Sequence, residues 1–335
     1  MKRSQEQVGL MNGLQQWSLV VAVVMGLLLM TCRQEPGQEL HLNHGPVASD
    51  PESDAGTLRP EFTAVDPDRL EEYYRLLLNF SPRPAASARL EELRVRLQEI
   101  LEGWSLAVTC EPFEVLSDRG KLRMVNLIAE KKGRTAELIY LGSHVDTKTM
   151  PGFEVIGAND STSSTAALLE LARIVADRPT RCTYRFAFFD GEEALGEHMT
   201  YSDGLYGSRH HAQRLLAEGR VLDVRAFILL DMIGDRDLRI TRDTHSSPEL
   251  WSLFVSCCNR LGYTEIVGDQ EMAVLDDHIP FRELGIPAVD IIDFEYGPGN
   301  SLWHTPADVP ENVSVESIRR VTEAVRCMLT HLENE

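Results

Sequence analysis

Several uninterrupted hydrophobic runs in this chain end at side chains that can bind a metal or carry a proton. His144 follows LIYLGS, Glu193 follows FAFFDGE and Asp231 follows FILL. Short runs that are apolar throughout are typical of strands buried on both faces of a parallel sheet. Ligands of such sheets bind beyond the carboxyl ends of the strands, so we expect these three side chains to meet in one crevice.

Two more residues of the same chemical type lie in turn-rich segments. Asp160 lies in GANDS, where it can cap the helix expected to begin near Ser161. His304 lies in LWHTPAD, where a structural histidine is as common as a ligand. Imidazole nitrogens and carboxylate oxygens are ligands that zinc accepts in proteins. The five residues together therefore predict a zinc site, although none of them predicts it alone.

From residue 67 onward the sequence alternates between helical and strand-like patterns. Apolar residues at helical spacing predict two opening helices, around Leu70, Tyr73, Leu76 and Leu77 and around Leu90, Leu93, Leu97 and Ile100. Strands are expected at about 106–115, 123–130, 137–143, 183–189, 225–230 and 287–292. Further helices are expected at about 162–177, 206–218, 248–262 and 313–332. This alternation predicts one α/β domain, residues 66–335, with a central mixed, mostly parallel sheet flanked by helices.

The N-terminal segment has the features of an export signal. Lys2 and Arg3 precede an apolar run over residues 18–31, which is shorter than the roughly 20 residues of a membrane-spanning helix. The run ends in LMTC, which resembles a degraded lipoprotein cleavage box. We therefore expect residues 1–32 to be a signal peptide cleaved nearby, a lipoprotein signal with lipid on Cys32, or an uncleaved anchor.

Residues 33–65 are polar, lack periodicity and are expected to be a flexible tether. The catalytic part should then work outside the cytoplasm, in the periplasm or beyond, with membrane contact only through the N-terminal anchor. The formal net charge of −19 argues against nucleic acid as a partner, because polyanion binding needs clustered Lys and Arg.

The six cysteines do not have the paired C-x-x-C spacing of a structural zinc site. In an exported protein a single disulfide among five of them is one interpretation, and buried free thiols are the favoured one. These five are Cys110, Cys182, Cys257, Cys258 and Cys327.

Adjacent glutamates follow one of the predicted strands, in the string DGEEA. Neighbouring residues that leave a strand point to opposite sides, so Glu193 can bind metal while Glu192 stays free as a general acid or base. An isolated pair of this kind is more often a solvated loop, but the other ligand candidates favour the catalytic interpretation. In the H-x-D string, Asp146 is expected to orient the His144 imidazole.

Seven strings resemble, in this order, the zinc-dependent M28 peptidase superfamily and, within it, the bacterial relatives of glutaminyl cyclase. They are YLGSHVDTK, VIGANDSTSSTAALLELAR, FFDGEEA, DGLYGSRHHA, LLDMIG, LDDHIPFRELGIP and WHTPAD. The resemblance covers roughly residues 67–333. It implies a single α/β domain with the phosphorylase/hydrolase-like fold of the zinc exopeptidases.

The resemblance also implies roles for individual residues. Asp160, Glu193 and His304 match the ligands of the zinc that both branches share. Glu192 matches the catalytic acid/base of both branches. A cis peptide bond is expected between Asp160 and Ser161.

Two activities on peptide or protein N-termini are compatible with the resemblance. In a cyclase with one zinc, Glu192 moves a proton from the attacking α-amine of glutamine to departing ammonia, and Asp231 and Asp277 support it by hydrogen bonding. In an aminopeptidase, His144 and Asp231 help to hold a second zinc, and Glu192 activates an attacking water. The number of zinc ions is not readable from these residues.

Some strings favour the cyclase branch. They are DGLYGSRHHA, DDHIPF and the tryptophan Trp303, expected to contact substrate, beside His304. The family's tryptophan after GEEA is absent, and His198, Met199 and Tyr201 lie there instead, so the aminopeptidase stays as the alternative. A non-catalytic M28-like binding domain is a minor alternative, because such a module needs neither five ligand-type residues nor Glu192.

Overall fold

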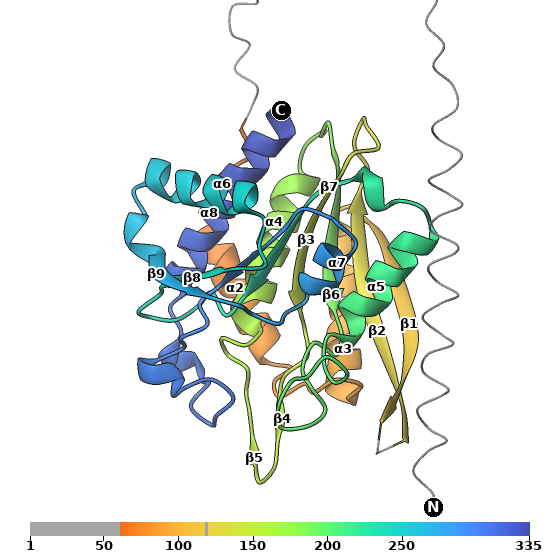
Figure 1. The fold of residues 1–335 in the computed structure, drawn as a ribbon, viewed down its shortest axis with the longest axis vertical. Helices are drawn as coiled ribbons and strands as arrows, with labels where there is room; N and C mark the ends of the chain where they lie inside the picture. Colours follow the sequence, from red (N-terminus) through yellow and green to blue (C-terminus); the bar gives the residue numbers. More distant parts are fainter. Residues whose placement is uncertain (1–60, 118–119) are drawn as a thin grey trace, which may run out of the picture. The chain divides into compact units, whose positions relative to one another are not determined.

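A central sheet of eight strands organises the part of the protein described by the computed structural model, residues 61–117 and 120–335 (Figure 1). The predicted signal, residues 1–32, and residues 33–60 of the predicted tether lie outside the described residues. In spatial order the strands are β1 (Ala107–Ser117), β2 (Gly120–Lys131), β6 (Thr183–Phe189), β3 (Leu138–His144), β7 (Val224–Asp231), β10 (Ala288–Ile292), β8 (Ile240–Asp243) and β9 (Val267–Met272).

The middle of this sheet is parallel and its margins are mixed. Strands β6, β3, β7 and β10 run parallel to one another. Strands β1 and β2 form an antiparallel hairpin that continues antiparallel onto β6, and β8 runs antiparallel to β10 and parallel to β9. A separate small hairpin consists of β4 (Thr149–Met150) and β5 (Phe153–Glu154), which projects at the lower end in Figure 1.

Helices cover both faces of the sheet. Within the described residues they are α2 (Pro67–Leu78), α3 (Ala88–Gly103), α4 (Thr162–Ala176), α5 (Tyr206–Ala217), α6 (Pro248–Leu261), α7 (Ile279–Glu283) and α8 (Val315–Asn334). Side chains of β3 show how the two faces divide, because they alternate along the strand. Ile139 and Leu141 pack in the core that includes α2, α3, α4, α6 and α8, whereas Leu138 and Tyr140 pack with residues of α5 and α7. Burial on both faces explains why this strand is apolar throughout.

Helix starts follow local capping rules. The Asp66 side chain accepts hydrogen bonds from the backbone N–H groups of Asp68 and Arg69, and Pro67 begins α2. Ser87 caps α3 and Ser314 caps α8 in the same way. Each cap satisfies donors that have no partner inside the helix.

The predicted fold class is confirmed, and each predicted helix and strand is present with its ends shifted by a few residues. Strands β8 and β9, the β4–β5 hairpin and helix α7 were not predicted. Strand β8 was missed because it has only four residues. Strand β9 was missed because its sequence, VGDQEM, is polar, as fits a strand at the edge of the sheet.

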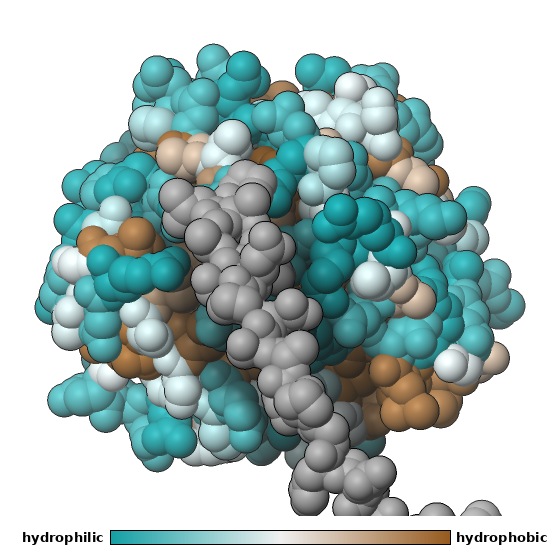
Figure 2. Space-filling view, turned by 90° about the horizontal axis from the view of Figure 1, so that it is seen from above, coloured by the Kyte–Doolittle hydropathy of each residue, from teal (hydrophilic) through white to brown (hydrophobic). Residues whose placement is uncertain are grey.

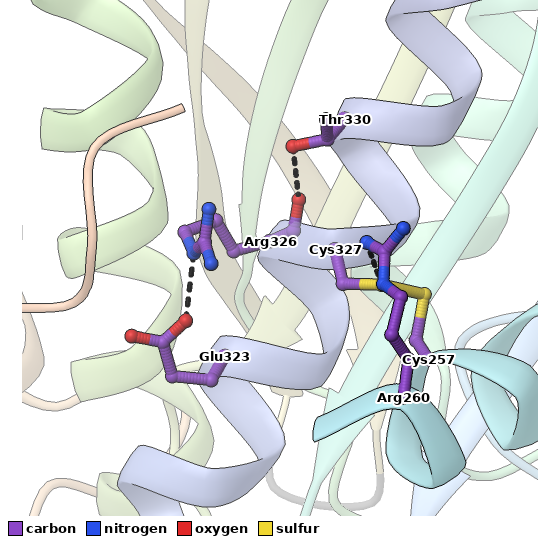
Figure 3. The surroundings of a disulfide bond; sticks show 6 residues. All are labelled: Cys257, Arg260, Glu323, Arg326, Cys327 and Thr330. Carbon is purple, nitrogen blue, oxygen red and sulfur yellow. Dashed lines mark hydrogen bonds and ion pairs between the residues drawn. A yellow bond between two sulfur atoms is a disulfide. The ribbon is translucent and has the colours of Figure 1, made fainter. Parts of the chain in front are cut away.

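The expectation of free thiols was wrong for two cysteines. A disulfide joins Cys257 of α6 to Cys327 of α8 (Figure 3). Cys110, Cys182 and Cys258 are free. The two bonded residues lie on neighbouring helices that spacing alone did not place together, so the pairing could not be read from the sequence.

The face seen from above in Figure 2 is mostly hydrophilic, and its hydrophobic residues form small separate groups. None of the helices of residues 61–117 and 120–335 combines the length and the apolar character needed to cross a membrane.

We predict that replacing both Cys257 and Cys327 with serine lowers the free energy of unfolding by about 2–4 kcal/mol. The bond links residues 70 positions apart, and such a crosslink restricts the unfolded polypeptide. Urea unfolding monitored by circular dichroism measures the difference. Cys110→Ser, which removes an exposed free thiol, is the control and should unfold like the wild type. Equal stability of the double variant and the wild type would contradict the prediction.

Candidate metal centre and active site

The parallel strands deliver polar residues to one edge of the sheet. His144 is the last residue of β3, and its register partner on β6 is Phe189, after which the backbone turns into the glutamate pair. Asp231 is the last residue of β7 and is paired with Ile292 of β10. The expected convergence at the carboxyl ends of the strands is therefore present.

Asp160, Glu193 and His304 come together in the folded protein. The Nε2 atom of His304 lies 3.3 Å from Asp160 Oδ2 and 3.1 Å from Glu193 Oε1. All three ligating atoms lie within 4.8 Å of one another. Two ligands at bond lengths of about 2.0–2.1 Å from a tetrahedral zinc are about 3.3 Å apart, so this donor set fits the metal.

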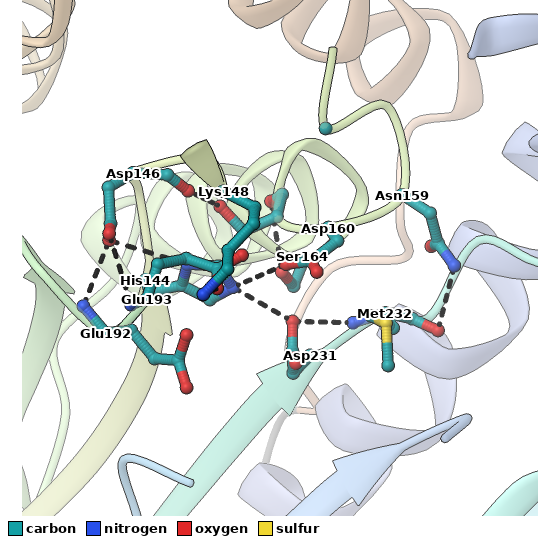
Figure 4. Close-up of polar contacts among 12 residues, drawn as sticks. His144, Asp146, Lys148, Asn159, Asp160, Ser164, Glu192, Glu193, Asp231 and Met232 are labelled. Carbon is teal, nitrogen blue, oxygen red and sulfur yellow. Dashed lines mark hydrogen bonds and ion pairs between the residues drawn. The ribbon is translucent and has the colours of Figure 1, made fainter. Parts of the chain in front are cut away.

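A second group of ligand-type atoms adjoins the first and shares Asp160. His144 Nε2 lies 3.0 Å from Asp160 Oδ1 and 3.3 Å from Asp231 Oδ1 (Figure 4). Because Asp160 presents one oxygen to each group, a second cation position beside the first is geometrically available. The two groups together include all five residues that the sequence analysis singled out.

Asp146 has a role that the sequence did not reveal. Its two carboxylate oxygens accept hydrogen bonds from the backbone N–H groups of Glu192, at 3.1 Å, and Glu193, at 3.2 Å. Its Oδ1 also lies 3.6 Å from Nδ1 of His144, so the expected contact with the imidazole is present (Figure 4). In addition to this contact, Asp146 holds the tip of the loop that carries Glu192 and Glu193.

Asp308 fixes the other ligand loop in the same manner. Its carboxylate accepts hydrogen bonds from the backbone N–H of Asn159, at 2.8 Å, and from that of Asp160, at 3.3 Å. The side chain of Asn159 in turn accepts from the backbone N–H of Gly234, at 2.7 Å. The peptide bond between Asp160 and Ser161 is cis, as expected.

A buried lysine supports the glutamate loop. Lys148 donates to the backbone carbonyl of Ala194 at 2.9 Å, and its Nζ lies 3.6 Å from Glu193 Oε2. Its side chain is almost completely buried. A positive charge in this position offsets the negative charge of Glu193, which is costly to bury without a partner.

Arg83 is fully buried and contacts neutral acceptors. Its Nε donates to the carbonyl of Val145 at 2.6 Å, and its terminal nitrogens donate to Ser81 Oγ at 2.7 Å and Thr162 Oγ1 at 3.0 Å. Val145 follows His144, and Thr162 opens α4 two residues after Asp160. Burial lowers the pKa of Arg83 to about 10. Arg83 therefore joins the two loops that carry candidate ligands.

Glu192 is the one member of the glutamate pair that stays unpaired. Its side chain lines the pocket, and within residues 61–117 and 120–335 its carboxyl group has no hydrogen-bond partner. Burial raises its pKa well above the ordinary value, and the negative charges of Glu193 and Asp276 add to this, against the opposing effect of His144. A carboxyl group with a raised pKa can both accept and release a proton near neutral pH.

Further buried acids surround Glu192. Burial raises the pKa of Asp231 to about 6 and that of Asp276 to about 7. We expected Asp277 to support Glu192 and had no such expectation for Asp276. Asp276 lines the pocket, whereas Asp277 is fully buried and is not part of the lining. Both belong to the same DDH string, and only the folded backbone decides which of them faces the cavity.

The pocket above these acids measures about 450 Å³. Trp303 forms part of its wall and stacks on the imidazole of His304, with ring centroids 4.0 Å apart. His198 and Met199, from the loop that lacks the family's tryptophan, also line it, whereas Tyr201 is 76% exposed and is not part of the lining. A cavity of this size, apolar with a few convergent polar groups, is typical of a small-ligand site.

One more His and Asp cluster lies outside the pocket. Asp243 accepts hydrogen bonds from the backbone N–H of Val274 and from Ser246 Oγ, and its Oδ2 lies 3.0 Å from Nε2 of His278. His245 completes the group. The carboxylate of Asp243 is already engaged by these donors, so we interpret the cluster as a structural connection that fixes the DDH segment.

We predict that Glu193→Gln and His304→Ala each abolish tight zinc binding, because each removes one of three protein ligands. Metal analysis after dialysis against a weak chelator measures the bound zinc per protein molecule. Glu197→Gln, which changes a pocket carboxylate outside the trio, is the matched control and should bind zinc like the wild type. Full zinc occupancy in both ligand variants would rule out the assignment.

We also predict that Arg83→Met lowers the free energy of unfolding by about 3 kcal/mol, because it leaves buried acceptors without donors. Chemical denaturation of the apoprotein measures this loss. Arg89→Met serves as the control, since the Arg89 side chain is largely exposed and, among the described residues, is paired only with Glu92 on its own helix. If the two variants unfolded at the same denaturant concentration, Arg83 would not hold the loops together.

Comparisons with known proteins agree with this geometry. A mouse glutaminyl-peptide cyclotransferase-like protein is 30% identical over 79% of this chain and 76% of its own length. A glutaminyl-peptide cyclotransferase of Drosophila melanogaster is 29% identical over 57% of this chain, and the match spans 60% of that protein.

The solved structure of an Acidobacteriales bacterium glutaminyl cyclase superposes with a TM-score of 0.78 at 27% identity, covering 83% of this chain and 98% of that one. A leucine aminopeptidase precursor from Bacteroides thetaiotaomicron reaches 0.73 at 23% identity over 81% and 98%, which shows the fold alone. The model of peptidase family M28 matches residues 126–329. The protein is therefore a member of the M28 family of enzymes.

Proposed function

We propose that this protein is a zinc-dependent glutaminyl-peptide cyclotransferase, which converts N-terminal glutamine of peptides to pyroglutamate and releases ammonia. The observation that carries the proposal is the free, buried carboxyl group of Glu192 beside the Asp160, Glu193 and His304 trio. The names of the relatives at 29% and 30% identity support the choice of reaction.

The trio would hold the zinc, which when bound polarises the γ-amide carbonyl of the substrate glutamine. The α-nitrogen attacks the γ-carbonyl carbon, so a ring bond forms between these two atoms while the bond from that carbon to the amide nitrogen breaks. Glu192 lies where it can take the proton that the α-nitrogen loses and deliver it to the departing nitrogen, which leaves as ammonia. No water enters this reaction.

The other acids of the pocket would control the proton on Glu192. Asp231 is tied to His144 at 3.3 Å, and Asp276 lies on the pocket wall. Carboxyl groups with raised pKa values can donate hydrogen bonds as well as accept them. Asp231 and either member of the DDH pair, Asp276 or Asp277, would thus support the transfer. Trp303 would supply an apolar wall for the substrate.

The alternative is an M28 aminopeptidase, and one observation favours it. The group formed by His144, Asp160 and Asp231 offers a second cation position beside the first. In that case two zinc ions would be held and Glu192 would activate water rather than shuttle a proton between two nitrogens. One zinc ion per protein molecule goes with the cyclase, and two go with the peptidase.

We propose in addition that residues 1–32 direct the protein out of the cytoplasm, and that the protein contacts the membrane only through this segment. The basic start and the apolar run of residues 18–31 support this. Sequencing the N-terminus of the mature protein from fractionated cells tests it. A protein that retains Met1 and occurs in the cytoplasm would contradict export.

The reaction is tested by product mass. Incubated with a glutaminyl peptide, the purified protein should yield a product lighter by one ammonia. A leucyl peptide should remain uncleaved. Release of free N-terminal amino acid from either peptide would instead support the aminopeptidase.

We predict that Glu192→Gln retains the bound metal and the fold but loses on the order of 10²–10⁴-fold in turnover, because the amide cannot carry the proton. Rate and metal content are measured on the same preparation. Glu197→Gln, assayed on the same peptide without acidic residues, provides a matched control at the pocket rim. A near-normal rate, or loss of metal from Glu192→Gln, would show that the roles of Glu192 and Glu193 are assigned wrongly.

A further inference from the structure

The pocket lining combines two kinds of apolar side chain. Phe294 and Trp303, with ring centroids 5.4 Å apart, are aromatic and rest on a small core that includes Ile292. Met150 of β4 and Met199 of the loop after the glutamate pair are methionines and also belong to the lining. Methionine side chains adapt to ligands of different shapes. The pocket therefore continues onto a surface hairpin that the proposed chemistry does not use.

Met150 connects the pocket lining to the β4–β5 hairpin, which extends outward from the pocket. Met150 and Phe153 are register partners in the antiparallel pair, so their side chains lie on the same face of the hairpin. Gly152 between them has a φ of +89°, a conformation that favours glycine and forms the tight turn. Phe153 is 39% exposed, although it is a large apolar residue. Because Met150 lines the pocket, the exposed Phe153 continues the apolar wall beyond the rim.

Under the proposed cyclase function, the α-amine and the glutamine side chain of a bound peptide would lie beside Glu192, and its remaining residues would extend toward the opening of the pocket. A cavity of about 450 Å³ is within the range for ligands larger than one amino-acid residue. The rim also carries Glu197, whose charge repels an acidic side chain on the substrate. An apolar second residue gains contact area here, and an acidic one does not.

We propose that Met150 and Phe153 form a subsite for a bulky apolar side chain at the second position of the substrate peptide. The proposal rests on the proposed cyclase function. The preferred substrates would be peptides that begin with glutamine followed by a residue such as phenylalanine or leucine. Peptides with glycine or aspartate in second position are poorer substrates.

The test compares kcat/KM for three tripeptide amides that differ only at the second residue: phenylalanine, glycine and aspartate. The wild type should prefer phenylalanine to glycine by about tenfold, and aspartate should be the poorest. In the double variant with Met150→Ala and Phe153→Ala, the preference for phenylalanine over glycine should fall to about twofold. The change should lie in KM, with kcat and bound zinc unchanged, because the subsite binds the substrate away from the reacting atoms.

Leu222→Ala is the matched control. Leu222 is 97% exposed and lies in η1 (Val221–Asp223). This segment precedes the start of β7, whereas the site lies at the other end of that strand, where Asp231 is. This variant should keep the tenfold preference. If all three peptides were cyclised with kcat/KM values within twofold, or if the double variant kept the full preference, the subsite would be refuted while the cyclase function stood. If the zinc-loaded wild type cyclised none of them, the proposed function would fail and the subsite with it.

Discussion

The geometry of the site depends on one carboxylate, that of Asp146, which accepts hydrogen bonds from two successive backbone amides. Through these bonds, the loop after β3 fixes the loop after β6, so Glu192 and Glu193 cannot move independently of His144. Asp308 repeats this arrangement at Asn159 and Asp160. Hydrogen bonds from backbone amides to a charged acceptor are stronger than those between neutral groups, and inside a protein they are screened little. Each ligand loop is thus held by its backbone, which leaves its side chains free for metal and substrate.

The electrostatics of the site explain why a cation belongs there. Asp146, Asp160, Glu192, Glu193 and Asp231 are all buried within a short distance of the pocket. Burial of carboxylates is unfavourable unless positive charge compensates it. Two side chains of the protein provide positive charge: Lys148 beside Glu193, and the fully buried Arg83, which donates hydrogen bonds to both ligand loops. Bound zinc would add the largest local charge, and it would lower the pKa of every acid that it contacts.

Much of the fold was readable from the sequence because its strands are buried on both faces. An uninterrupted apolar run such as LIYLGS is typical of an inner strand of a parallel sheet, and the ligand candidates follow at or just after the strand ends. The contacts of Asp146 were not readable, since the H-x-D spacing says nothing about which distant amides lie within reach. Arg83 escaped notice because the string SPRPAAS is typical of an exposed turn, whereas its guanidinium is fully buried. The Cys257 and Cys327 pairing depends on how α6 lies against α8, which no local pattern encodes.

The central claim is that Asp160, Glu193 and His304 bind zinc while Glu192, their neighbour, remains free. Diffraction from crystals of the zinc-loaded protein, recorded on both sides of the zinc absorption edge, tests it most directly. We predict one anomalous peak, about 2.0–2.2 Å from an atom of each of the three residues, with the Glu192 carboxylate outside the coordination sphere. A peak bound by Glu192 in place of Glu193, or one located only at the Asp243, His245 and His278 cluster, would contradict it.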